Sequence, residues 1–175
     1  MGKMTSKEIE KTLPTLCSAI EKILEQHKDE KGIIHTHSYK ISNFIKNNVK
    51  SSRLLFSDSS TREETLKKHM KSKKPTVLVS PSMTEGVDLR GDSSRFQILC
   101  KVPYPFLGDK IVKKRMNKWK WWYSFQTAKS VIQSIGRSIR SENDKAVTYI
   151  LDADWSRFYA YNKKLFPEDF SDCIK

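Results

Sequence analysis

The clearest β-strand in this sequence is Thr76-Val77-Leu78-Val79-Ser80, an apolar run that directly follows Pro75. The run is continuous, which is typical of a strand in a parallel sheet covered on both faces, because a strand with one wet face alternates apolar and polar residues. Four further apolar runs predict strands of the same type, at residues 32–36, 53–57, 95–102 and 146–151.

Helical patterns separate these strands. Apolar residues recur every three or four positions over residues 9–24, and Pro14 within this segment is expected to kink or restart the helix. Residues 39–49 and 125–139 also have helical periodicity, and a capping box at residues 60–63 is expected to open another helix. Strands that alternate with helices favour a single α/β domain of three layers, with a mostly parallel central sheet and helices on both faces.

Length and composition exclude several classes of protein. The chain has 175 residues, of which 37% are hydrophobic, so it can form one sizeable core. It contains no apolar stretch of the roughly 18–20 residues that a membrane-spanning helix needs, and its first ten residues contain no apolar core of a secretion signal. Cys17, Cys100 and Cys173 lie far apart, which argues against a disulfide framework and against a zinc or iron–sulfur site. We therefore expect a reduced, intracellular compartment.

The net charge points to a polyanionic partner. There are 33 Lys and Arg residues and 20 Asp and Glu residues, so the formal charge is +13. Such an excess suits nucleic acid or nucleotide phosphate, although a solvated, lysine-rich surface is the alternative. The densest basic segment has six basic residues within residues 110–120 and is followed by aromatic residues. It could bind phosphates and stack on bases, but we expect at least two of Trp119, Trp121 and Trp122 to pack against the core or against a missing neighbour.

Residues 133–140 carry the sharpest polar pattern. On a helix, with about 100° per residue, Gln133, Arg137 and Arg140 share one stripe. The opposite, apolar face would consist of Ala128, Val131, Ile135 and Ile139. Closely spaced arginines on a packed helix suit a phosphate group, which a guanidinium can bind with two hydrogen bonds. The alternative is an ordinary solvated face, on which Asp144 is a candidate ion-pair partner for Arg140.

A second polar cluster follows the clearest strand, at residues 80–89. Thr84 could donate a hydrogen bond to a phosphate oxygen, and Gly86 could allow a close approach of the backbone to a ligand. Ligands of open parallel sheets bind beyond the carboxyl ends of the strands, which is where this loop is expected to lie. The alternative is a turn between a strand and a helix, with side chains that only cap the helix.

Other motifs do not carry chemistry. His35 and His37 place two imidazoles on one face of a strand, but no third ligand is visible, so we expect no metal site. The chain contains no GxxxxGK[ST] sequence, the phosphate-binding loop of many ATPases.

Taken together, these segments resemble the second motor domain of superfamily 2 helicases, in the DinG-like and xeroderma-pigmentosum-group-D-like branch. Residues 32–39 look like motif IV, residues 80–89 like motif V and residues 133–140 like motif VI, in that order along the chain. Residues 102–106 also resemble the apolar-Pro-Phe-Pro segment of this branch. The resemblance implies a RecA-like domain over residues 32–175, preceded by a helical lead-in over residues 1–31.

The resemblance also implies a role for each site residue. Arg137, Arg140 and Gln133 would reach the γ-phosphate of ATP, the two arginines as arginine fingers. The residues that would bind ATP or couple its cleft to the nucleic acid are Glu85, Gly86, Asp88 and Gly136. The residues that would contact single-stranded DNA are Thr36, Ser38, Tyr39 and Thr84.

The implied cofactors are ATP and Mg²⁺ in an intact helicase, where the first motor domain would hold the Mg²⁺. That domain is not in this sequence, so we expect the isolated chain to hydrolyse no ATP. The implied partners are single-stranded DNA and the first motor domain, in the same polypeptide or as a separate subunit. The residues leave two alternatives. One is a non-catalytic nucleic-acid-binding module, and the other is a RecA-like nucleotide-binding domain that does not move along a nucleic-acid strand.

Overall fold

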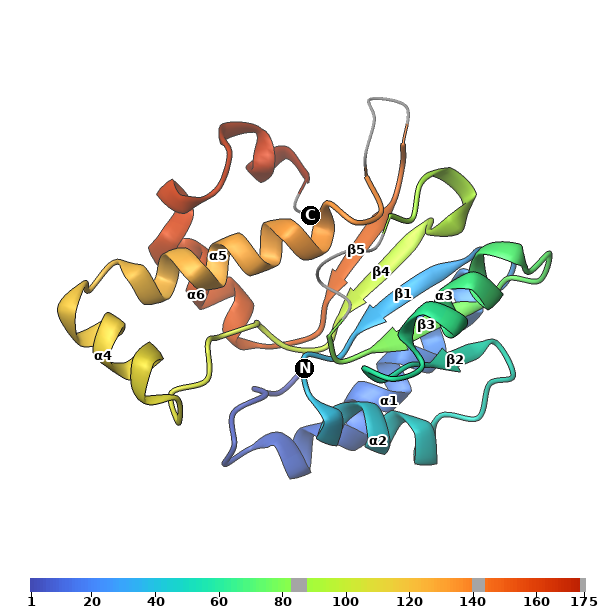
Figure 1. Ribbon diagram of the computed structural model, residues 1–175, viewed down its shortest axis with the longest axis horizontal. Helices are drawn as coiled ribbons and strands as arrows, with labels where there is room; N and C mark the ends of the chain where they lie inside the picture. Colours follow the sequence, from blue (N-terminus) through green and yellow to red (C-terminus); the bar gives the residue numbers. More distant parts are fainter. Residues whose placement is uncertain (83–87, 140–143, 174–175) are drawn as a thin grey trace.

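The computed structural model describes residues 1–82, 88–139 and 144–173 (Figure 1). These residues form a five-stranded, all-parallel sheet with the order β2-β3-β1-β4-β5. The strands are β1 (Gly32–His35), β2 (Leu54–Phe56), β3 (Val77–Ser80), β4 (Phe96–Leu99) and β5 (Val147–Ile150). All five lie within the predicted runs, which confirms the predicted parallel sheet.

Six α-helices and three short 3₁₀ helices connect and cover the described strands. The α-helices are α1 (Ile9–Gln26), α2 (Tyr39–Asn48), α3 (Arg62–Lys71), α4 (Lys110–Lys118), α5 (Trp122–Ile135) and α6 (Asp154–Asn162). The 3₁₀ helices are η1 (Gly91–Ser93), η2 (Lys163–Leu165) and η3 (Glu168–Cys173). In residues 1–82, 88–139 and 144–173, no helix is long and apolar enough to cross a membrane.

Burial on both faces of the sheet produces the three predicted layers. On one face, Ile34, Val79 and Ile98 belong to a core cluster with residues of α1 and α2. On the other face, Ile33 and Leu78 pack with Leu66 of α3, while Leu99 and Ile150 pack with α5 and α6. Successive residues of one strand point to opposite faces, so a strand that is buried on both sides must be apolar throughout.

The helix α1 belongs to the same core as the sheet. It passes through Pro14 as one continuous helix, and its residues Leu13, Leu16 and Ile20 are fully buried in the cluster that contains Ile34. The division into residues 1–31 and 32–175 stays a prediction, but the first unit contributes core side chains to the second.

Two predicted helix ends differ from the structure. The capping box at residues 60–63 does not form: α3 starts after Thr61, whose side chain makes no capping bond. Instead, the carboxylate of Asp58 accepts hydrogen bonds from the backbone N–H groups of Ser60 and Thr61, at 2.8 and 2.9 Å, and from their hydroxyls. These bonds lower the pKa of Asp58 to about 2, because they stabilise the ionised carboxylate. The other difference is α5, which ends at Ile135 rather than near Ile139.

Gly32 permits the close contact between β1 and β4. A Cβ atom at this position would lie 2.6 Å from the ring of Phe96 and 2.7 Å from its carbonyl oxygen. We expect Gly32→Ala to lower the free energy of unfolding by about 1–3 kcal/mol, as overpacking does in a buried core. Urea unfolding measures this, with Lys28→Ala as an exposed control that should change it by less than about 0.5 kcal/mol. Equal stability of the two variants would contradict the packing argument.

Candidate functional site

The carboxyl ends of β1, β3 and β4 place two of the predicted motifs side by side. His35, the last residue of β1, is in register with Ser80 of β3 and with Leu99 of β4. The backbone pairing continues beyond the strands, because the N–H of Thr36 donates to Ser80 O at 3.0 Å. Residues 36–39 and the segment that follows β3 therefore leave the same edge of the sheet from neighbouring strands.

The predicted nucleic-acid residues of the first loop differ in exposure. Thr36 is fully buried, and its hydroxyl donates to the carbonyl of Ser38 at 3.1 Å, so its side chain shapes the turn. Ser38 is half-buried at the N-cap of α2. Tyr39 is 55% exposed, so of these three side chains it is the most accessible to a ligand at this edge.

His35 and His37 form a stacked pair beside this loop. Their ring centroids are 5.9 Å apart, and His37 adopts a positive φ of 49°. Both ring nitrogens of His35 and Nε2 of His37 are buried without a hydrogen-bond partner among the described residues. Burial lowers the pKa of His35 to about 3, helped by His37 and Arg137, and burial together with Lys101 lowers that of His37 to about 4. Both imidazoles are therefore neutral at pH 7.

The described residues contain no group of three His, Cys, Asp or Glu side chains that could hold a metal ion. Two neutral imidazoles beside Arg137 and Lys101 also form a poor environment for a further cation, because its charge would be repelled. We assign no metal to the histidine pair.

Arg137 lies in a turn after α5, not on the helix. The helix ends at Ile135 and residues 136–138 form a turn, so the predicted helical placement of Arg137 beside Gln133 is wrong. Gln133 is half-buried in the last turn of α5. Ala128 and Val131 are buried as predicted, whereas Ile135 is only partly buried and Ile139 is 41% exposed.

Gly136 is the C-cap of α5, with a φ of −66°, so this glycine is not required by its backbone angle. A Cβ atom there would lie 3.3 Å from Ile132 O, which is a tight contact. Arg137 is half-buried, and its charge is close enough to His35 to lower the pKa of the imidazole. The turn thus brings the arginine toward the carboxyl end of β1.

The segment after β3 is bonded to the turn after α5. The N–H of Leu89 donates to the carbonyl of Arg137 at 3.2 Å, and the N–H of Gly91 donates to Asp144 Oδ1 at 3.1 Å. Asp88 is exposed and accepts a hydrogen bond from Arg90 at 2.8 Å. Four predicted site residues, Thr84, Glu85, Gly86 and Arg140, lie outside the described residues, as does the suggested pair of Arg140 with Asp144.

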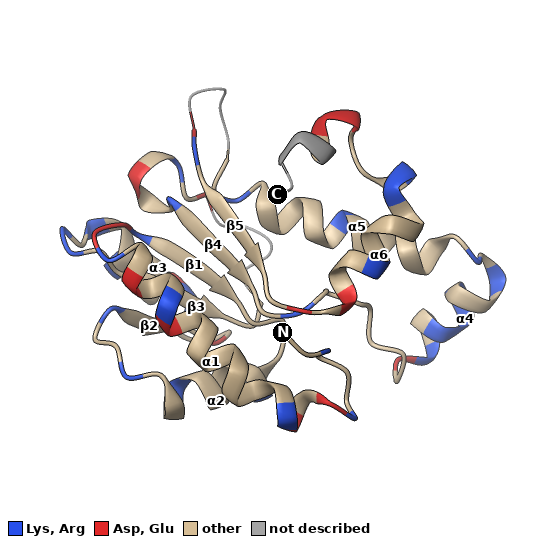
Figure 2. Cartoon of the chain, turned by 180° about the vertical axis from the view of Figure 1, so that it is seen from behind, with Lys and Arg blue, Asp and Glu red and all other residues tan. Residues whose placement is uncertain are grey.

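The structure does not pack two of the tryptophans of residues 110–123 into the core, and packing against a missing neighbour stays a prediction. Trp119 and Trp121 are 41% and 60% exposed, and Trp122 is only partly buried. The physical reason is that α4 extends from the body of the domain and buries none of its own residues in the described structure (Figure 2). Of its apolar residues, Val112 and Met116 are only partly buried and Ile111 is exposed.

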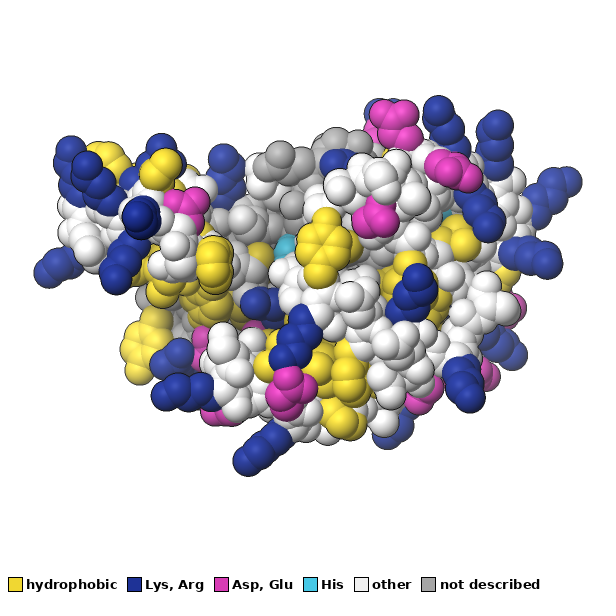
Figure 3. All heavy atoms as spheres, turned by 60° about the horizontal axis from the view of Figure 1, so that its bottom comes forward, with side chains coloured by type: hydrophobic (Ala, Val, Ile, Leu, Met, Phe, Trp, Pro, Cys, Tyr) yellow, Lys and Arg dark blue, Asp and Glu magenta, His cyan; other side chains and the backbone are white. Residues whose placement is uncertain are grey.

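We call the exposed side chains of this region the α4 surface. Its members are Phe106, Lys110, Ile111, Lys113, Lys114, Arg115, Lys118, Trp119, Lys120 and Trp121. Figure 3 shows Lys and Arg side chains interspersed with apolar ones at the end of the molecule that α4 forms. Lys118 Nζ lies 4.9 Å from the ring centre of Trp119, so cations and aromatic rings are in direct contact on this surface.

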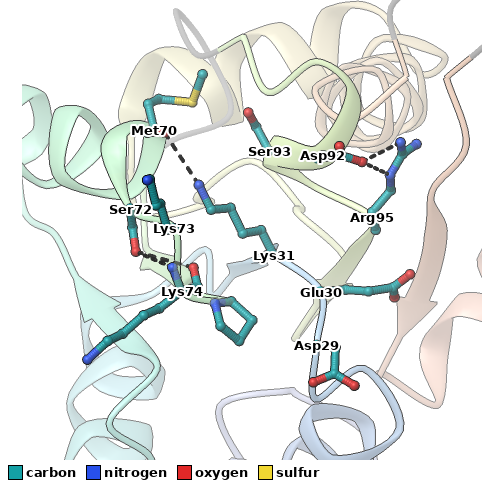
Figure 4. A pocket seen from close by; sticks show the side chains of 11 residues that line it. Asp29, Glu30, Lys31, Met70, Ser72, Lys73, Lys74, Asp92, Ser93 and Arg95 are labelled. Carbon is teal, nitrogen blue, oxygen red and sulfur yellow. Dashed lines mark hydrogen bonds and ion pairs between the residues drawn. The ribbon is translucent and has the colours of Figure 1, made fainter.

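The opposite edge of the sheet contains a cavity that is unrelated to these motifs. It has a volume of about 520 Å³ and lies at the amino ends of β1, β3 and β4, with Lys31, Lys74 and Arg95 among its lining residues (Figure 4). Two of its cations are already engaged: Lys31 donates to the carbonyl of His69, and Arg95 forms an ion pair with Asp92. We assign it no part in the site.

Sequence reasoning missed the roles of Asp152 and Gln97. Asp152 is buried, and its carboxylate accepts hydrogen bonds from the backbone N–H groups of Met4, Val102 and Asp154, at 3.0–3.2 Å. A carboxylate directly after a strand was a visible signal for this role. Gln97 is fully buried, and its side chain is hydrogen bonded to the end of α5. The sequence signal for this role is a polar residue inside an otherwise apolar strand.

The buried histidines predict an acid-sensitive fold. An unfolded histidine has a pKa near 6.5, but His35 in the fold has one of about 3, so below pH 6.5 the unfolded chain takes up a proton that the folded chain excludes. The free energy of unfolding should fall as the pH drops from 6.5 toward 3, by up to about 1.4 kcal/mol per pH unit for His35. Urea unfolding at pH 7, 6 and 5 measures this slope, and His35→Phe should reduce it. An unchanged slope in His35→Phe would contradict the assignment.

Comparisons with known proteins show the family to which this chain belongs. Residues 20–171 match the family model described as "Helicase C-terminal domain". The chain is 32% identical over 111 residues to the ATP-dependent DNA helicase DinG of Photobacterium profundum, which covers 57% of this chain and 16% of that protein. It is 29% identical over 104 residues to the ATP-dependent DNA helicase CHL1 of Candida albicans, with 49% and 12% covered. The chain thus aligns with less than a fifth of the length of these two relatives.

Solved structures share the fold at low sequence identity. Xpd4 of S. tokodaii superposes with a TM-score of 0.71 and 19% identity, over 96% of this chain and 35% of that one. Domain 2 of the DEAD-box helicase Mss116p, bound to an RNA duplex, superposes with a TM-score of 0.57 and 18% identity, over 93% and 57%. The RecA-like fold is therefore confirmed, and the family match over residues 20–171 shows that this chain belongs to the helicase C-terminal domain family of DinG-, XPD- and CHL1-type helicases.

Proposed function

We propose that this chain is the second motor domain of an ATP-dependent DNA helicase. It would supply Arg137, with Arg140 and Gln133, to ATP that is bound by a separate P-loop domain, and would contact single-stranded DNA. The observation that carries this proposal is the hydrogen bond from Leu89 N–H to the Arg137 carbonyl. This bond joins the segment after β3, which leaves the sheet beside the loop of Ser38 and Tyr39, to the turn that carries Arg137.

The residues of this chain fit a supporting role toward ATP rather than the main binding site. The sequence has no P-loop, so the β- and γ-phosphates and Mg²⁺ would be held by the P-loop domain. Arg137 would donate to the oxygens of the γ-phosphate, where a guanidinium stabilises the negative charge that moves during transfer. The neutral state of His35 supports this role, because an uncharged imidazole adds no second positive charge beside the guanidinium.

Gly136, together with Asp88 and the residues at positions 84–86, would couple this cleft to the bound strand. Asp88 and Leu89 are adjacent in sequence, and Leu89 is bonded to the turn of Arg137. The turn of Arg137 and the segment that begins at the carboxyl end of β3 would therefore move together as one body when ATP binding closes the two domains. Domain closure and opening of this kind would move the protein along DNA.

Two surfaces would bind the strand. The edge of the sheet offers Ser38 and Tyr39, with Thr36 buried beneath them. The α4 surface offers cations for phosphates and the exposed rings of Trp119 and Trp121 for base stacking, the combination that suits single-stranded nucleic acid. The Lys and Arg side chains of the α4 surface are exposed and do not contribute to the core. This supports a role for them in binding nucleic acid.

A non-catalytic nucleic-acid-binding module is the second candidate. The α4 surface favours it, because its cations and aromatic rings could bind a strand without any ATP turnover. The two functions differ in whether Arg137 matters: a module would bind DNA equally well without this side chain.

The arginine is tested in the complete ATPase, this chain together with its P-loop domain. We expect Arg137→Ala to lower kcat for ATP by about 10³-fold or more, as for other arginine fingers, while thermal unfolding changes little. Arg137→Lys should rescue poorly, since an ammonium lacks the planar fork of donors. Lys129→Ala is the matched control, an exposed cation on α5 that should leave turnover unchanged. The chain alone should show no turnover; unchanged kcat in Arg137→Ala would favour the binding module.

The α4 surface is tested with the isolated chain and a labelled single-stranded oligonucleotide. We expect Trp121→Ala to weaken binding by about 1–3 kcal/mol, which corresponds to the loss of one stacked base. Lys113→Ala should lower the slope of log Kd against log salt by about 0.7 if it removes one phosphate contact. The matched control is Lys67→Ala, an exposed lysine on α3. If Trp121→Ala and Lys113→Ala both bind like the wild type, the α4 surface does not contact the strand.

A further inference from the structure

A buried polar cluster lies between β4 and the turn that carries Arg137. Its members are the side chains of Ser94, Gln97, Ser138 and Thr148, of which the first three are at most 1% exposed. We call it the Gln97 cluster. The neighbours of Gln97 in β4, Phe96 and Ile98, are fully buried and apolar, so an amide at this position is an exception to the pattern of the sheet.

The amide of Gln97 binds the end of α5. Its Nε2 donates to the carbonyl of Ile135, the last residue of the helix, at 3.0 Å, and to Thr148 Oγ1 of β5 at 2.8 Å. In a helix that continued, the carbonyl of Ile135 would accept from the N–H of residue 139. Here the carbonyl accepts from the N–H of Ser138 at 3.4 Å and also from the amide of Gln97, so Gln97 anchors the end of α5 to β4.

Ser138 is held from the other end of the turn. The hydroxyls of Ser94 and Ser138 share a 2.7 Å hydrogen bond in which either can be the donor. Ser138 Oγ also lies 3.4 Å from Gln97 Oε1. Arg137 is therefore flanked by two residues, Ile135 and Ser138, that are held by side-chain hydrogen bonds from Gln97 of β4 and from Ser94, two residues before β4.

The third attachment is the carbonyl of Arg137 itself, which accepts from Leu89 N–H. A short turn with three independent attachments has little freedom to move, and a side chain on it keeps a defined direction. Placement of this accuracy matters for a group that acts on a transferring phosphate, because a shift of about 1 Å can lower a rate by about 10²-fold.

We propose that Gln97 is a positioning residue for Arg137: its amide anchors the end of α5 at Ile135 to β4 and orients the turn that presents the guanidinium. The expected effect of Gln97 on catalysis rests on the proposed function of Arg137. Its effect on the position of the turn does not depend on that function. A buried amide costs free energy unless it is hydrogen bonded, so an apolar residue would fill this place more simply if packing were its only purpose.

The catalytic test uses the complete ATPase with Gln97→Met, which keeps the length of the side chain and removes its donors. We expect kcat to fall by about 10²-fold, with KM for ATP nearly unchanged, because the arginine would act mainly on the transferring phosphate. The matched control is Thr127→Val in α5. Thr127 is as buried as Gln97, and its hydroxyl donates to the carbonyl of Tyr123. Because Thr127 lies ten residues before Arg137, this variant should lose stability without losing kcat.

The structural test uses hydrogen exchange of the Leu89 amide in the isolated chain, followed by NMR. We expect faster exchange in Gln97→Met and no change in Thr127→Val. If Gln97→Met folds poorly, Gln97→Met/Thr148→Val removes the partner hydroxyl as well and should regain stability but not kcat. Unchanged Leu89 exchange, or a kcat equal to that of Thr127→Val, would overturn the inference. Should Arg137→Ala leave turnover intact, the proposed function fails, and the exchange rates still decide whether Gln97 holds the turn.

Discussion

The central strand β1 is the constraint on which the rest of the molecule depends. It is hydrogen bonded to β3 on one side and to β4 on the other, with all strands parallel, so residues that follow different strands meet at one edge. The register of His35 with Ser80 and Leu99 fixes which loops become neighbours there. This single pairing brings together segments that are more than 60 positions apart in the sequence, counting from His35 to Leu99, and the motifs acquire a common site only through it.

Buried polar groups set the fine geometry of that site. Apolar packing holds α5 against the sheet through Ala128 and Val131, but it does not decide where the helix ends. The amide of Gln97 and the hydroxyl of Ser138 hold the turn that follows the helix, because each must find a partner once it is removed from water. The same principle applies to Asp152, whose carboxylate joins the N-terminal segment at Met4 to the segments that follow β4 and β5.

The α4 region is held to the domain at the two ends of its segment, and the helix between these ends is largely exposed. Tyr104 stacks on Tyr123, with ring centroids 5.9 Å apart, and its hydroxyl donates to Asp154 at 2.6 Å, while Tyr123 donates to the carbonyl of Pro105. These contacts hold the two ends of the segment on the domain. The helix between them is stabilised by Asp109, whose carboxylate caps its first turn, and so its cations and aromatic rings stay available to a polyanion.

The sequence alone determined the fold class, because strands such as Thr76-Val77-Leu78-Val79-Ser80 must be buried on both faces and helices must supply the cover. It also determined the order of the helicase-like motifs and the choice of Arg137 as a candidate site residue, which stays a prediction. The anchoring of the end of α5 could not be read from periodicity, since the hydrogen bond from Gln97 to Ile135 joins residues 38 positions apart. The exposure of Trp119 and Trp121 was also decided only by the tertiary structure, because an apolar side chain is buried only where a neighbouring element covers it, and no residue of α4 is fully buried in the described structure.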